Sequence, residues 1–154
     1  AVEEIVAGAV NRIRKGFPER KLSVKVPNEL LMVPMDGTLI MQVLINLLEN
    51  AVKHSPDDST IAVEVKKLDD SAVFEVIDDG NGIAKQDLPH LFDGYVSDKN
   101  PSADSSRGMG IGLSICNSIV KAHDGNLEAA NRETGGAVLR FTLPLKGDEI
   151  QHGQ

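Results

Sequence analysis

Apolar residues recur every three or four positions in several stretches of the chain, which is the spacing that lines one face of a helix. The clearest stretch follows Asp36, a good N-cap residue, and ends at Ser55-Pro56, where proline disfavours another helical turn. The polar stretch over residues 93–108 has no periodicity and predicts a loop. The pattern as a whole predicts helices over residues 2–17, 37–54, 85–92 and 111–123.

Other stretches alternate apolar and polar residues with period two, as a strand does when only one of its faces is buried. Asp69-Asp70-Ser71 separates two of these stretches and Gly135-Gly136 separates two more, so both pairs are expected to form hairpins. Strands are predicted over residues 22–26, 30–35, 60–68, 72–78, 125–131 and 137–145. Helices interspersed with hairpins favour an α+β fold, an α/β sandwich in which a mixed, largely antiparallel sheet carries its helices on one face.

The composition is that of one ordinary globular domain. Its 154 residues suit a single domain, which we place at residues 1–145, followed by a flexible tail at 146–154. The net charge is −7 without a Lys/Arg cluster, which disfavours nucleic acid, and no apolar run has the length of a membrane span. The single cysteine, Cys116, lies in an apolar stripe and is interpreted as a core residue. Because the chain opens at Ala1 without Met in a helical pattern, we interpret it as a domain of a longer protein.

One flank of the helix predicted over residues 37–54 carries a group of polar side chains. Asn46, Asn50 and Lys53 fall within about 60° of one another at 3.6 residues per turn, next to the apolar stripe. The amide oxygen of Asn50 is a ligand type that Mg²⁺ accepts, and Lys53 offers a charge for phosphate oxygens. The alternative is a solvated helix edge. His54 points back towards the stripe and is predicted to be half-buried.

The strand predicted over residues 72–78 ends in an acidic residue on its apolar face. Phe74, Val76 and Asp78 share that face, so the carboxylate of Asp78 is directed towards the core and needs a partner, such as the amino group of adenine. Gly80 and Gly82 follow directly, where bare backbone leaves room for a planar base. The alternative is a simple strand-ending turn.

Three glycines at alternate positions, Gly108, Gly110 and Gly112, come directly before the last predicted helix. The free amides and positive dipole of a helix start favour an anion such as phosphate, and glycine lets those amides approach closely. The alternative is a hinge. The spacing is neither that of a P-loop nor that of the dinucleotide-binding fingerprint.

Four segments occur along the chain in the order "NLLENAVKH", "DDGNGI", "LFDGYV" and "RGMGIGL". On these segments the chain resembles the ATP-binding catalytic domain of bacterial sensor histidine kinases, within the superfamily that includes gyrase and MutL. The resemblance runs from about Val2 to Leu145 and implies a Bergerat-type ATP-binding fold with ATP and Mg²⁺ as cofactors. The flanks "VLINLLENAVKHSP" and "NRETGGAVLRFTLPL" are most similar to those of the potassium-responsive kinases of the Kdp system (KdpD-like).

Residue by residue, the resemblance implies that Asn50 binds Mg²⁺, that Lys53 contacts phosphate, and that Asp78 binds adenine. It assigns the catalytic roles to Asn46 and Lys53. Further nucleotide contacts are implied at His54, Gly80, Gly82, Ile83, Phe92, Tyr95, Arg107, Gly108, Met109, Gly110, Ile111, Gly112 and Leu113. Of these, Phe92 and Tyr95 are implied to anchor a lid over residues 93–107 that closes on ATP.

The chain departs from the family pattern at three places. Asp79 stands where the family usually has Asn, and Ser97 stands where many members carry an Arg, which leaves Lys99 or Arg107 to replace it at the γ-phosphate. Asn46 occupies the position of the glutamate that activates water in gyrase-like members. Phosphoryl transfer is therefore favoured over hydrolysis.

The resemblance implies a cytoplasmic domain of a membrane-anchored sensor kinase, which transfers the γ-phosphoryl group of ATP to a histidine. None of the chain's four histidines lies in the family's acceptor setting: His54, His90, His123 and His152. The acceptor is expected on a separate dimerisation and phosphotransfer domain, with a response regulator downstream, and this piece alone is expected to be monomeric. Two alternatives stay open, namely a serine kinase of the anti-sigma-factor type and a non-catalytic ATP-sensing module.

Overall fold

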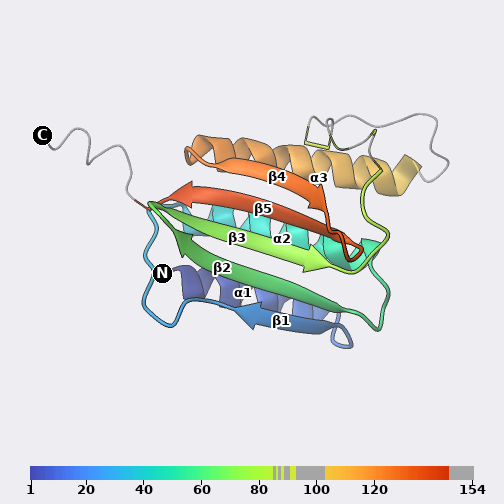
Figure 1. Ribbon diagram of the computed structural model, residues 1–154, viewed down its shortest axis with the longest axis horizontal. Helices are drawn as coiled ribbons and strands as arrows, with labels where there is room; N and C mark the ends of the chain where they lie inside the picture. The colour runs from blue at the N-terminus through green and yellow to red at the C-terminus, as the bar shows by residue number, and fades with distance from the viewer. Residues whose placement is uncertain (85, 87, 89–90, 93–102, 146–154) are drawn as a thin grey trace, which may run out of the picture.

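The computed structural model describes residues 1–84, 86, 88, 91–92 and 103–145, with side chains described from residue 112 onwards in the last range. The elements within these ranges are α1 (Val2–Gly16), β1 (Lys21–Lys25), α2 (Gly37–His54), β2 (Thr60–Leu68), β3 (Ser71–Asp78), α3 (Ala103–Ala122), β4 (Asn126–Asn131) and β5 (Ala137–Pro144). The strands form one sheet in the order β1-β2-β3-β5-β4, with β1 parallel to β2 and the other pairs antiparallel. All three helices lie on one face of it (Figure 1), which confirms the predicted α+β fold.

The core lies between the sheet and α2, the central helix, which packs against α1, α3 and β3. The apolar stripe of α2 faces this interior, and its buried residues are Ile40, Val43, Leu44, Ile45, Leu47, Leu48 and Ala51. From the sheet, the rings of Phe74 and Phe141 on adjacent strands stack with their centroids 4.5 Å apart. Cys116 of α3 is buried as predicted, and burial raises the pKa of its thiol to about 11, which makes it a core residue and not a nucleophile.

Side chains from distant parts of the chain fix both ends of α2. At its start, Asp36 accepts a hydrogen bond from the Leu39 amide, as predicted for an N-cap, and the Asp36 amide donates to Nε2 of His123. The other ring nitrogen of His123 donates to the Ile119 carbonyl, which ties α3 to the start of α2. At its end, the buried guanidinium of Arg20 donates to the Ser55 hydroxyl and to the carbonyl of the next residue. The position of the last turn of α2 is thereby set from outside the helix.

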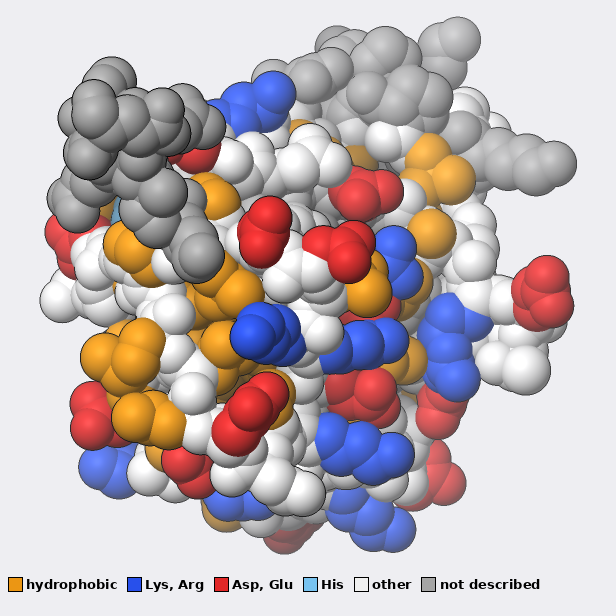
Figure 2. Space-filling view, turned by 60° about the vertical axis from the view of Figure 1, so that its left-hand side comes forward, with side chains coloured by type: hydrophobic (Ala, Val, Ile, Leu, Met, Phe, Trp, Pro, Cys, Tyr) orange, Lys and Arg blue, Asp and Glu red, His pale blue; other side chains and the backbone are white. Residues whose placement is uncertain are grey.

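The outer face of the sheet carries charged side chains in place of helices. Glu75 of β3 is buried there between Arg140 and Lys66, whose nitrogens lie 2.7 Å and 3.2 Å from its carboxylate oxygens. Burial by itself would raise the pKa of Glu75, but the hydrogen bonds from Arg140 and Lys66 outweigh it and hold the pKa below its usual value. Figure 2 shows basic and acidic side chains interspersed over this face. The charged pattern explains why the helices cover only the opposite face.

The strand predicted over residues 30–35 is wrong. Its period-two pattern is real, because Leu31 and Val33 are buried while Leu30 and Met32 are exposed. The backbone nevertheless joins no ladder, and the Leu31 carbonyl accepts a hydrogen bond from the Val2 amide at the start of α1. An alternating pattern shows that successive side chains point in opposite directions, but a strand also requires backbone hydrogen bonds to a neighbouring strand.

The start of the last helix is also wrong. We predicted a helix from residue 111 after a loop, but α3 begins at Ala103, so all three glycines of the alternating set lie inside it. Each residue added to a helix gains one backbone hydrogen bond. These gains outweigh the cost of glycine in a helix, which is about 1 kcal/mol per residue.

Other predicted segments fall largely outside the described residues. They are the helix over residues 85–92, most of the loop over 93–108, and the tail over 146–154. No helix within the described ranges is both long enough and apolar enough to cross a membrane.

Candidate functional site

The end of α2 and the loop that follows β3 meet at one end of the sheet (Figure 1). A Cβ atom added at Gly80 would lie 1.8 Å from the carbonyl oxygen of His54, the last residue of α2. Only glycine therefore allows the two segments to approach this closely. We predicted that Gly80 makes room for a planar base, and the structure gives it a second role in packing against α2.

Asp78 is buried at the end of β3, with 6% of its surface exposed. It lies on the same strand face as the fully buried Phe74, as predicted. One carboxylate oxygen accepts a hydrogen bond of 2.8 Å from the Gly80 amide. Burial raises the pKa of Asp78, and the amides of Gly80 and Ala137 together with the nearby His54 partly oppose that rise. The site thus holds a buried, inward-facing acid that is oriented by two backbone amides.

The flank of α2 carries the three polar residues that the helical spacing placed together. Asn46 is engaged by protein, since its Oδ1 accepts from Gln42 at 2.8 Å and its Nδ2 lies 3.6 Å from the Cys116 sulfur. Asn50 differs, because its Oδ1 is buried and has no hydrogen-bond partner among the described residues. A buried carbonyl oxygen without a partner costs free energy, and amide oxygens are ligands that Mg²⁺ accepts. Asn50 therefore fits the predicted metal-ligand role.

Two basic residues, Lys53 and His54, complete this end of α2. Lys53 is exposed, so its ammonium group is accessible to a ligand. His54 is solvent-accessible as well, since the buried stripe of α2 ends at Ala51, and its partial desolvation agrees with the predicted half-burial. Desolvation by neighbouring atoms nevertheless lowers the pKa of His54, which the carboxylate of Asp78 opposes and Lys53 reinforces.

The glycine set on α3 has a different geometry from the one we predicted. Gly108, Gly110 and Gly112 lie within the helix, so they do not offer free amides at its start. A Cβ atom at Gly112 would meet no atom of the described residues within 4 Å, and the next residue, Leu113, is buried in the core. Gly112 thus presents bare backbone directly beside a core residue of α3.

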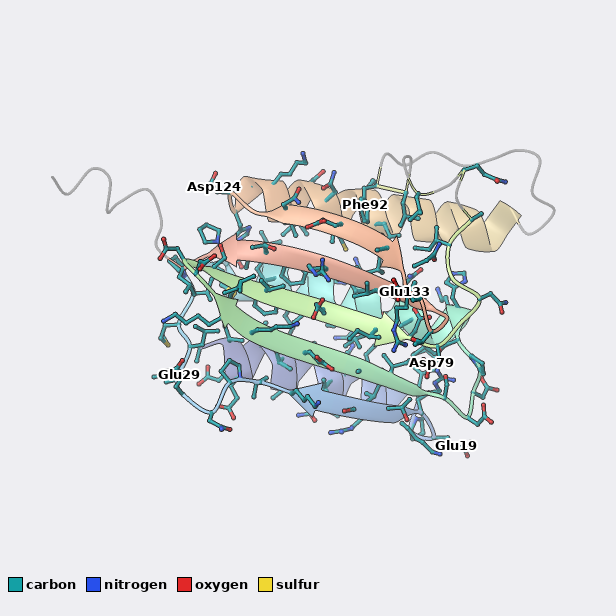
Figure 3. All side chains as sticks on the ribbon, in the orientation of Figure 1. Glu19, Glu29, Asp79, Phe92, Asp124 and Glu133 are labelled. Atoms are coloured by element: carbon teal, nitrogen blue, oxygen red, sulfur yellow. The ribbon has the colours of Figure 1, made fainter. Side chains whose placement is uncertain are left out.

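The remaining predicted contacts divide into two groups. Ile83 and Phe92 are partly buried against the core, where Figure 3 marks Phe92. Tyr95 lies outside the described residues, as do the side chains of Arg107, Met109 and Ile111.

The β4–β5 hairpin contributes two residues that the sequence analysis missed. Asn131 forms two hydrogen bonds with the backbone of Ile83, and Arg132 forms an ion pair of 2.7 Å with Asp79. Figure 3 shows Asp79 and the hairpin-turn residue Glu133 at the same end of the sheet. In the sequence, only the departure at Asp79 from the usual family residue pointed to this contact. The spacing along the chain gave no indication that Arg132 is its partner.

Comparison with known proteins identifies this arrangement. Residues 35–147 match the family described as histidine kinase-, DNA gyrase B-, and HSP90-like ATPase. Sensor protein KdpD of Clostridium acetobutylicum is 49% identical over 143 residues, which are 93% of this chain and 16% of that protein. Sensor protein KdpD of Escherichia coli is 35% identical over 143 residues, with the same coverage of 93% and 16%. The chain spans about a sixth of the length of these curated relatives.

Solved structures give the same result. The nucleotide-free catalytic domain of histidine kinase ThkA matches with a TM-score of 0.81 and 26% identity, covering 95% of each chain. The mycobacterial sensor histidine kinase MprB shares the fold, with a TM-score of 0.78 and 24% identity over 93% of each chain. The chain therefore belongs to the histidine kinase-, DNA gyrase B- and HSP90-like ATPase family, as an ATP-binding catalytic domain of the histidine kinase type.

Proposed function

We propose that this domain binds ATP with Mg²⁺ between the end of α2, the end of β3 and the glycine segment of α3, and transfers the γ-phosphoryl group to a histidine on a separate dimerisation and phosphoacceptor domain. The observation that carries the proposal is the buried carbonyl oxygen of Asn50, which has no partner among the described residues. In this proposal Asn50 holds Mg²⁺, and Asp78 accepts a hydrogen bond from the adenine amino group. Mg²⁺ supplies charge neutralisation at the phosphate oxygens when it is bound.

Phosphoryl transfer depends mainly on positioning and on neutralising charge, and the residues of α2 are suited to both. The exposed ammonium of Lys53 is free to contact a phosphate oxygen one turn after Asn50. Asn46, whose amide is held by Gln42 and Cys116, has no basic group with which to activate water. This supports transfer to an acceptor over hydrolysis.

The position of the glycines inside α3 suggests how the triphosphate is held. An amide inside a helix already donates to a carbonyl four residues earlier, so it is free for phosphate only if the first turns of α3 open. Glycine is the residue type, proline apart, that resists helix formation most, by about 1 kcal/mol. We infer that Gly108, Gly110 and Gly112 lower the free energy needed to unwind the first turns of α3.

The Gly112→Ala variant tests this role. We expect α3 to become more stable, by up to about 1 kcal/mol in urea unfolding, because alanine favours the helix and its methyl group meets no described atom. We expect ATP·Mg affinity to fall roughly tenfold in calorimetry, because the methyl group and the stiffer helix keep the amides from the phosphates. Ser118→Ala on the exposed side of the same helix is the control and should leave affinity unchanged. If the Gly112→Ala variant is more stable but binds ATP·Mg with unaltered affinity, the proposed role of the glycines in phosphate binding is wrong.

Neither described histidine is suited to be the phosphoacceptor. Both ring nitrogens of His123 are engaged, by Asp36 and Ile119, and His54 lies beside Asp78 and Gly80 in the proposed nucleotide site itself. The test mixes the chain with radiolabelled ATP and Mg²⁺, alone and together with a separately produced phosphoacceptor domain of a KdpD-type kinase. We expect label on the acceptor domain only when both proteins are present. Strong labelling of the chain alone, or rapid ATP turnover without an acceptor, would contradict the proposal.

The physiological assignment rests on the two KdpD relatives. We propose that the whole protein is a membrane-anchored sensor kinase in potassium or osmotic signalling, with a response regulator as its downstream partner. The 49% identity to KdpD of C. acetobutylicum supports this. In the same phosphotransfer assay, an acceptor domain from a sensor kinase of another type should then be labelled more slowly than the KdpD-type domain.

A further inference from the structure

The loop after β3 is held by side chains of a strand that does not neighbour it. In the sheet, β5 lies between β3 and β4, so the backbones of β3 and β4 do not pair. Asn131, the last residue of β4, bridges the gap: its Oδ1 accepts from the Ile83 amide at 2.6 Å and its Nδ2 donates to the Ile83 carbonyl at 2.7 Å. Both polar groups of one peptide-like side chain are thus used on one residue of the loop.

The next residue of the hairpin grips the other end of the same loop. Nη1 of Arg132 lies 2.7 Å from Oδ1 of Asp79 and 3.4 Å from the carbonyl oxygen of Asp78. The backbone of Arg132 is itself fixed, since its amide donates to the Gly136 carbonyl and its carbonyl accepts from the Gly135 amide. Asn131 and Arg132 therefore hold the loop at both ends, from one rigid hairpin, and we call these two residues the hairpin clamp.

We propose that the hairpin clamp positions the nucleotide base: Asn131 and Arg132 hold the loop from Asp79 to Ile83 in the geometry that aims Asp78 at adenine. This rests on the proposed function of Asp78. The two residues are positioning residues, because they act through the loop and do not themselves touch the nucleotide.

The composition of the loop explains why a clamp is needed. Two of its five residues are glycines, and Gly82 has a φ of +78°. Without the clamp, this loop would therefore sample more backbone conformations than a loop of the same length without glycine. If the loop is already ordered before ATP binds, no binding free energy is spent on ordering it, and the affinity for ATP is higher. The ion pair is partly exposed, with Arg132 at 33% and Asp79 at 56%, so its contribution to overall stability is small. Its contribution is to geometry and to local charge.

The charges around Asp78 give the clamp a second, separable effect. Asp79 is a like charge on the adjacent residue and favours the protonated form of Asp78, whereas His54 on α2 favours the ionised form. Arg132 pairs with the carboxylate of Asp79 and so offsets its charge, while it contacts Asp78 only at the backbone carbonyl. Since the base is bound by the ionised carboxylate, protonation of Asp78 as the pH falls weakens binding.

The test compares two variants that both break the ion pair. Arg132→Ala leaves the charge of Asp79 uncompensated, so the pH below which ATP·Mg affinity falls should move upwards. Asp79→Asn removes that charge, so the same limit should move downwards. Affinity is measured by calorimetry between about pH 5 and 8. Equal profiles, or shifts in one direction for both variants, would overturn the electrostatic role of Arg132.

The geometric role is tested with Asn131→Ala. We expect ATP affinity to fall about tenfold, through the loss of two hydrogen bonds, together with a lower preference for ATP over GTP and an unchanged pH profile. In the phosphotransfer assay the loss should appear in KM and leave kcat within twofold. Asn126→Ala, at the far, exposed end of the same strand, is the control and should change none of these.

The outcomes separate this inference from the proposed function. If the unchanged chain takes up no ATP·Mg, the proposed function fails. If it binds and Asn131→Ala binds with the same affinity and the same ATP/GTP ratio, the hairpin clamp alone is refuted. Thermal unfolding of each variant confirms that it is folded before binding is compared.

Discussion

The Asp78→Asn variant is expected to bind ATP·Mg roughly 100-fold more weakly than the unchanged chain, the magnitude of a buried charge-assisted hydrogen bond with its donor left unpaired. One oxygen of the carboxylate already accepts from the Gly80 amide at 2.8 Å. Asparagine has only one acceptor oxygen, so it cannot accept from the Gly80 and Ala137 amides and from the amino group of adenine as the carboxylate does. At least one N–H donor that the Asp78 carboxylate accepts from is then left facing the NH₂ group of asparagine, which is itself a donor.

Isothermal titration calorimetry with ATP and Mg²⁺ measures this change. The fold should survive it, because asparagine has the same shape and removes a charge from a position that is only 6% exposed. Thermal unfolding checks that the variant is folded before binding is compared. Asp70→Asn in the β2–β3 turn makes the same chemical change away from the site, and its affinity should stay within twofold. Undiminished binding by Asp78→Asn would show that the base is held elsewhere.

The second large effect is expected for Asn50→Ala, which should slow phosphotransfer to the acceptor domain by at least roughly 100-fold, as expected when a metal ligand is removed. We expect this loss of phosphotransfer rate to occur without any loss of folding stability. The Oδ1 of Asn50 makes no hydrogen bond with the described residues, so its removal breaks none and ends the cost of burying it. We expect an unfolding temperature equal to or higher than that of the unchanged chain.

The rate is measured with radiolabelled ATP over a series of Mg²⁺ concentrations, because a weakened metal site requires more Mg²⁺. Glu49→Gln, the adjacent residue on the same helix, serves as the matched variant and should keep its rate. Transfer by Asn50→Ala within threefold of the unchanged chain, at every Mg²⁺ concentration, would exclude Asn50 as the metal ligand.

Local patterns in the sequence predicted most of the fold and the side chains of the site. The helical stripe of α2 identified both the core face and the flank with Asn46, Asn50 and Lys53, because both follow from 3.6 residues per turn. Period two likewise placed Asp78 on the inner face of β3. The motif order then indicated the family, which the comparisons confirm.

The errors arose where contacts between distant residues decide the outcome. The stretch with Leu31 and Val33 has the pattern of a strand but no pairing neighbour, and it bonds to α1 instead. The glycines of α3 indicated a helix start, whereas the gain from continuing the helix to Ala103 outweighs their low propensity.

By itself, then, the sequence determined which residues face inwards and which polar side chains share one helix flank or strand face, because both follow from spacing along a short segment. The ATP-binding fold followed from a resemblance carried by the order of four motifs. Only the tertiary structure decided that Gly80 must be bare beneath the end of α2, that β1 runs parallel to β2, and that Asn131 and Arg132 hold a loop about 50 residues earlier in the chain. Such contacts join segments whose separation carries no periodic signal, so they exist only once the sheet has brought those segments together.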